Sequence, residues 1–133
     1  MTVRLSTAMR DAVLEVLNTN LSGGVLRIYS GSQPGAVSTS ATGTLLAELT
    51  LGTPFGVVTA GVLSASPIIA DTAANAAGIP GWARLLSAGG VTARMDLSVT
   101  GSAGAGELKL DNMDVKVGAL VGVTSLTITA PAP

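Results

Sequence analysis

The chain lacks two of the residue types on which most protein chemistry depends. Its 133 residues contain no histidine and no cysteine, and they include only seven Lys and Arg and eight Asp and Glu. Zinc sites are built from Cys and His, and a serine nucleophile needs an activating base. Without Cys there is no disulfide framework either. We therefore expect no enzyme, no metal and no other cofactor, but a protein that packs and binds.

Clustered positive charge and long apolar runs are also missing. The formal net charge is −1 and the seven cations occur singly, whereas binding to a phosphate backbone depends on grouped cations. No uninterrupted apolar run approaches the ~18–20 residues of a membrane span. Asp11 and Glu15 lie where a signal peptide has its apolar stretch. We expect no nucleic-acid partner, no membrane insertion and an intracellular product.

Aromatic residues are rare, and the core is expected to be aliphatic. Only Tyr29, Phe55 and Trp82 are aromatic, although 47% of the residues are hydrophobic. Such a high apolar share predicts that some apolar surface serves another chain. Trp82 is expected either in the core or at the rim of an interface, where Trp is a common binding anchor. Tyr29 and Trp82 are both candidate interface residues.

One helix is predicted at the N-terminus. Ser6 is a suitable N-cap, and Asn18–Asn20 with Gly23–Gly24 end the helix after about three turns. One apolar stripe follows the helical period: Met9, Ala12, Val13, Val16 and Leu17. This stripe must be buried against a sheet or against a neighbouring subunit. We count Met9, Val13, Val16 and Leu17 as candidate interface residues.

After residue 24 the apolar period changes to two, which predicts strands. The segments that alternate are 25–30, 44–51, 93–99, 107–111 and 120–129, and shorter strands are expected at 56–58, 62–65, 68–69 and 82–86. Helices do not recur between them, and Gly-rich turns separate them. The predicted fold is a single domain, 1–133, that is mainly β: an N-terminal helical arm (1–20), an antiparallel β-sandwich or jelly-roll-like barrel (24–129) and an extended tail (130–133). The small-residue segment 31–43 is expected to be a long loop.

The groups that could do chemistry form no strong motif. Asp111, Asn112 and Asp114 are the one local cluster of oxygen ligands, and their spacing differs from that of a calcium loop, so we interpret them as a turn. Asp96 alternates with apolar neighbours, which is typical of a solvent-facing strand residue. The glycines of 101–106 precede a strand and not a helix, so they predict a hairpin or loop and not a phosphate site.

Several stretches, in this order and at this spacing, resemble small proteins that tailed bacteriophages and prophages encode among their virion structural genes. The stretches are RLSTAMRDAVLEVL, GGVLRIYSGSQP, GTLLAELTL, GWARL and VTSLTITAP. The resemblance implies a decoration or cement protein, made in the host cytoplasm, that lies on the capsid surface of the virion. Its implied partners are the phage major capsid protein and further copies of itself, as a homodimer or homotrimer.

Two other functions remain open from the sequence. A tail, baseplate or fibre-associated component involved in host-surface attachment would also use long Gly, Ser and Thr loops. A small carbohydrate-binding module would present an aromatic platform, which three widely spaced aromatic residues support poorly. The resemblance carries no functional motif, so it assigns no site residue.

Overall fold

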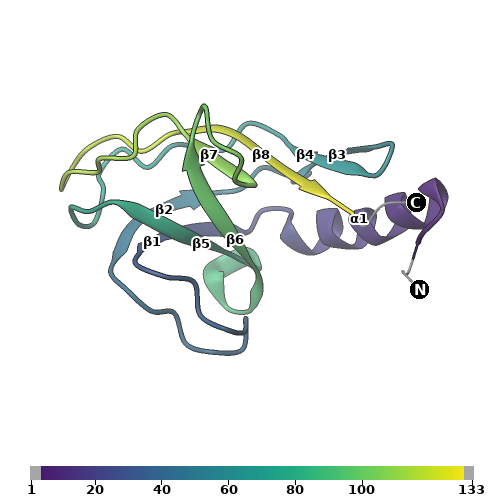
Figure 1. The fold of residues 1–133 in the computed structure, drawn as a ribbon, viewed down its shortest axis with the longest axis horizontal. Helices are drawn as coiled ribbons and strands as arrows, with labels where there is room; N and C mark the ends of the chain where they lie inside the picture. The colour runs from purple at the N-terminus through teal and green to yellow at the C-terminus, as the bar shows by residue number, and fades with distance from the viewer. Residues whose placement is uncertain (1–3, 131–133) are drawn as a thin grey trace.

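The computed structural model describes residues 4–130 and confirms a mainly β protein with one N-terminal helix (Figure 1). The elements are α1 (Thr7–Leu21), β1 (Val25–Ser30), β2 (Leu45–Thr50), β3 (Gly56–Thr59), β4 (Val62–Ala65), β5 (Pro80–Leu86), the 3-10 turn η1 (Ala88–Gly90), β6 (Ala93–Gly101), β7 (Leu108–Leu110) and β8 (Val123–Thr129). The predicted strand at 68–69 is wrong. Ile69 makes only an isolated bridge to Thr50. Residues 131–133 of the predicted tail lie outside the described part of the chain.

The strands form one curled sheet, open like half of a barrel, in the order β2-β1-β5-β6-β7-β8-β4-β3 (Figure 1). The predicted β-sandwich or jelly roll is not confirmed. The prediction that all pairs are antiparallel is wrong, because β6 and β7 run parallel, with Val99 opposite Leu108. The remaining pairs within residues 4–130 are antiparallel.

Glycines explain how two successive strands become parallel neighbours across a short connection. Such a crossover usually needs about a dozen residues or more, yet only Ser102–Glu107 joins β6 to β7. A Cβ at Gly104 would lie 2.4 Å from the Cβ of Thr100, so the connection folds directly against the strand that it leaves. The Gly-rich segment is thus a loop, as predicted, and not a hairpin.

The N-terminus of α1 is the one that the sequence predicts. The Ser6 Oγ accepts a hydrogen bond from the Met9 N–H at 3.2 Å, and the helix continues to Leu21. The apolar stripe is not the face that α1 buries against the sheet, so the first of the two alternatives for the stripe does not hold, and burial against a neighbouring subunit stays a prediction. Leu14 and Leu21 are fully buried, whereas Met9 stays exposed.

Polar contacts on the buried side of α1 fix its rotation over β3 and β4. The Asn18 Oδ1 accepts from the Gly56 N–H at 2.9 Å, and the Asp11 Oδ1 accepts from the Gly61 N–H at 2.7 Å. These anchors lie on the same side of the helix as Leu14. A pattern that counts only apolar residues therefore misplaces the packed face.

The concave side of the sheet holds an aliphatic core together with α1. The buried apolar side chains include Leu14, Leu26, Ile28, Leu49, Phe55, Leu63, Leu85, Leu97, Leu108 and Leu126. Alternation along β1 is as predicted, with Leu26 and Ile28 inside. In β2, Leu46 and Ala47 are both buried because the register with β1 shifts there, so the predicted strict alternation fails.

Candidate interaction surfaces

The outward face of α1 carries three large apolar side chains in the solvent. Met9, Val13 and Val16 are 55%, 45% and 60% exposed. Leu17, the fourth of the predicted interface residues on the helix, is partly buried and packs against the core. The predicted stripe is therefore not what holds α1 to the sheet. Met9, Val13 and Val16 form an apolar strip that no other part of residues 4–130 covers.

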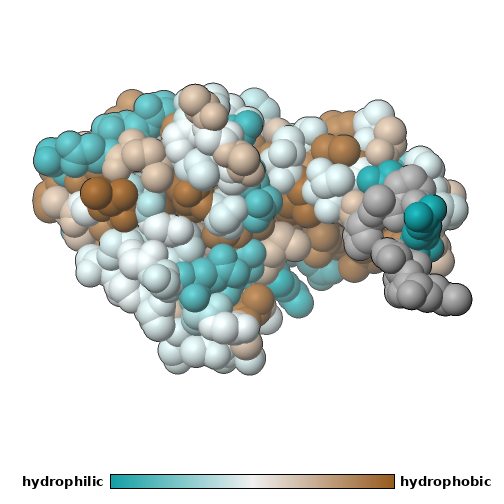
Figure 2. All heavy atoms as spheres, viewed as in Figure 1, coloured by the Kyte–Doolittle hydropathy of each residue, from teal (hydrophilic) through white to brown (hydrophobic). Residues whose placement is uncertain are grey.

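Further exposed apolar residues lie in and beside the segment 115–121, which runs at the end of the molecule opposite the start of α1 (Figure 1). Ile79, Val117 and Leu120 are 69%, 71% and 58% exposed. They belong to two antiparallel segments joined by the Gly78–Val115 and Asp71–Val121 bridges. Figure 2 shows apolar groups at both ends and in the middle of the visible face, interspersed with polar surface.

The convex side of β1, β5 and β6 carries an aromatic stack. The rings of Tyr29 and Trp82 lie 4.8 Å apart at an interplanar angle of 14°, and the Arg84 guanidinium carbon lies 5.2 Å from the Trp82 ring centroid. Trp82 is fully buried and Tyr29 half-buried. Trp82 is therefore buried, as the first alternative has it, but on the face of the sheet opposite the aliphatic core. In this chain Trp82 is no surface anchor, and its Nε1 has no hydrogen-bond partner among residues 4–130.

Beside this stack, four charged residues stand in register across four strands. Glu48 lies opposite Arg27, Arg27 opposite Arg84, and Arg84 opposite Asp96. Like charges directly opposite one another are destabilising, but here each arginine has its own carboxylate. The Arg27 Nε–Glu48 Oε2 distance is 2.7 Å.

The Arg84–Asp96 pair is the buried half of this row. Arg84 donates two hydrogen bonds to Asp96, at 2.7 and 3.1 Å, and the two side chains are only 7% and 3% exposed. The hydrogen bonds to Asp96 raise the pKa of Arg84 above its usual value, against the opposing effect of burial. The interpretation of Asp96 as a solvent-facing residue is therefore wrong. Alternation along one strand cannot show that the facing strand supplies a cation.

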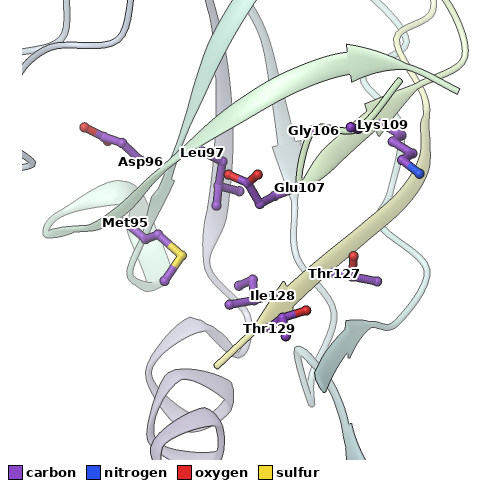
Figure 3. Close-up of a pocket in the computed structure, with 10 residues that line it drawn as sticks. Met95, Asp96, Leu97, Gly106, Glu107, Lys109, Thr127, Ile128 and Thr129 are labelled. Carbon is purple, nitrogen blue, oxygen red and sulfur yellow. The ribbon is translucent and has the colours of Figure 1, made fainter. Parts of the chain in front are cut away.

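A groove of about 560 Å³ opens between β6 and β8 (Figure 3). β7 separates these two strands only at Leu108–Leu110, and beyond it they diverge. Met95, Leu97 and Ile128 point into the space from its two sides, and Glu107 closes one end (Figure 3). No pattern in the sequence predicted this groove, because it results from the shortness of β7 and from the parallel pairing.

The acidic turn has the structure that the sequence predicts. The Asn112 Oδ1 accepts from the Asp114 N–H at 2.9 Å, and Lys116 lies 3.3 Å from the exposed Asp114 carboxylate. Across residues 4–130, no three His, Cys, Asp or Glu side chains come together as a metal site would need. Likewise, no helix within that range is long and apolar enough to cross a membrane.

The comparisons with known proteins identify no relative. The chain matches no family model, no curated protein and no solved structure.

Proposed function

We propose that this protein is a structural virion component that binds the outer surface of a phage capsid and stabilises it by bridging major capsid protein subunits. The observation that carries the proposal is the exposed apolar strip of α1, formed by Met9, Val13 and Val16. Apolar surface that a chain leaves in water is commonly an interaction site. The sequence resemblance to small virion proteins names the class of partner.

The rest of α1 suits the presentation of this strip to a partner. The helix is held to the body by Leu14 and Leu21 on one side and by the Asn18 and Asp11 hydrogen bonds. It therefore offers a rigid apolar surface whose side chains need little ordering when they bind. Preorganisation of this kind strengthens binding without any enlargement of the contact.

The second group of exposed apolar residues supports a bridging role. The segment 115–121, which carries Val117 and Leu120, lies at the other end of the molecule from the first turn of α1 (Figure 1), and Gly78, next to Ile79, pairs with it. A chain with an apolar surface at each end can contact two neighbours at once. Many copies on one shell then gain from multivalency, because each second contact is intramolecular. Self-association as a homodimer or homotrimer would use the same surfaces.

Co-sedimentation with expanded capsids of the phage that encodes the chain tests the proposal. The variant Met9→Gln/Val16→Gln changes two exposed helix positions and leaves the core intact. We expect its capsid affinity to fall at least tenfold, while the matched control Val91→Gln, at an exposed site away from α1, binds as the unmodified chain does. If the unmodified chain does not sediment with heads, the proposal is wrong.

Immuno-labelling of virions distinguishes the proposed place on the capsid from the alternative location, which is the tail, the baseplate or a fibre. The exposed loop 31–43 favours this alternative, since small polar loops also serve host-surface recognition. Label on the head supports the capsid role. Label on the tail supports the attachment role and overturns the first proposal.

A further inference from the structure

The sheet is incomplete between β6 and β8. On the side away from β5, β6 is paired with β7 only at Val99–Gly101. On the side away from β4, β8 is paired with β7 only at 123–126. The groove of about 560 Å³ lies where a longer β7 would continue between the two strands (Figure 3).

Glu107 ends the pairing by bridging both strands. Its carboxylate accepts hydrogen bonds from the Ser98 N–H at 3.2 Å and from the Ser98 hydroxyl at 2.9 Å. Its backbone carbonyl accepts from the Thr127 N–H at 3.1 Å. The carboxylate thus takes the place that a strand's carbonyl would occupy beside β6, and past Glu107 nothing in the described chain takes that place.

Two backbone edges therefore face each other across the groove. Every second residue of a strand directs its N–H to the same side. The Asp96 N–H thus points the same way as that of Ser98, and the Thr129 N–H the same way as that of Thr127. Asp96 and Thr129 both line the groove, and no hydrogen bond from residues 4–130 reaches either N–H on that side.

We infer that this groove binds an extended segment of another polypeptide, which adds to the sheet as a strand between β6 and β8, in line with β7. Added strands bind through main-chain hydrogen bonds, and alternate side chains give specificity. The segment that fits has three or four residues, with β-branched apolar side chains over Leu97 and Ile128, small polar side chains between them, and no proline. This inference is independent of the proposed capsid role.

The groove fits a polypeptide better than a small polar ligand. Small-molecule sites usually fix their ligand with a few convergent polar side chains. Here the Asp96 carboxylate is engaged by Arg84, and the Glu107 carboxylate is engaged by Ser98. The side chains of Lys109, Thr127 and Thr129 line the groove as well, but they come from two strands and form no convergent cluster. The backbone edges of β6 and β8 face the groove from both sides, and the partner that complements two strand edges is a third strand.

Amide hydrogen exchange of the full-length chain, followed by NMR, tests the inference with the peptide acetyl-Thr-Val-Thr-Val-Thr-amide. At millimolar peptide we expect exchange at the Asp96 and Thr129 amides to slow at least tenfold. The same peptide with both valines N-methylated keeps its carbonyl acceptors but lacks two of the N–H groups that an added strand donates to its neighbours, and its N-methyl groups obstruct the strand edge. It is therefore expected to have no effect. This comparison needs no change in the protein.

A pair of variants in one loop tests the location. Ala105 lines the groove, whereas Ala103 lies in the same loop outside it, and both are exposed. Ala105→Phe should abolish the protection and Ala103→Phe should preserve it. The inference is overturned if the peptide slows neither amide, if it protects the outer edges of β2 or β3 instead, or if concentrated protein alone protects Asp96 and Thr129, which would assign the groove to a second copy.

Discussion

At the scale of single residues, the buried ion pair distinguishes the two halves of the charged row. Arg84 and Asp96 are almost fully removed from solvent, whereas Arg27 and Glu48 are 30% and 46% exposed. An exposed ion pair contributes little, because water and salt screen it. A buried charge that loses its partner is strongly destabilising. Removing one partner of the buried Arg84–Asp96 pair should therefore cost more stability than removing one partner of the exposed Arg27–Glu48 pair.

Asp96→Asn is expected to destabilise the protein by about 3 kcal/mol, because it leaves the Arg84 guanidinium buried without a counter-charge. Glu48→Gln, the matched change in the exposed pair, should cost less than about 1 kcal/mol. Urea denaturation of both variants measures the difference. Equal losses in the free energy of unfolding would show that burial does not determine how much each ion pair contributes to stability.

The loop between β6 and β7 depends on a glycine where the chain returns against its own strand. Gly104→Ala places a methyl group 2.4 Å from the Cβ of Thr100. We expect a loss of about 1–3 kcal/mol, as for other overpacked sites. Gly35→Ala is the control, since a Cβ there meets nothing within 4 Å. A Gly104→Ala protein as stable as the Gly35→Ala protein would contradict this account of the crossover.

At the scale of elements, the sequence predicts what depends on neighbours along the chain and misses what depends on partners across it. The Ser6 cap and the alternation of β1 are local, and both were predictable. The packed face of α1 was not, because Asn18 and Asp11 select it through backbone groups of Gly56 and Gly61. The burial of Asp96 and the groove beside β7 likewise depend on strand order, which no spacing in the sequence encodes.

Replacing one side chain on each face of α1 by alanine distinguishes the buried face from the exposed one. Leu14 is 1% exposed and Val16 is 60% exposed. Leu14→Ala should destabilise the fold by about 2–5 kcal/mol, since it opens a cavity in the core. Val16→Ala should stay within about 0.5 kcal/mol of the unmodified chain. Thermal denaturation checks both values, and the reverse order would mean that the helix packs through its predicted stripe.

At the scale of the whole molecule, a half-barrel with a helix packed against β3 and β4 at one end leaves three surfaces for other chains. These are the outward strip of α1, the apolar residues near Gly78 and Val115, and the groove between β6 and β8. All three are available for contact with another chain, and the capsid is the partner that we propose.

The central claim is the place of this chain on the head, and a cryo-electron microscopy difference map tests it most directly. Virions that carry the chain are compared with virions from which its gene is deleted. The account predicts density on the outer capsid surface over junctions between major capsid subunits, with Met9, Val13 and Val16 of α1 against the shell. Density confined to the tail, or no difference on the head, would contradict it.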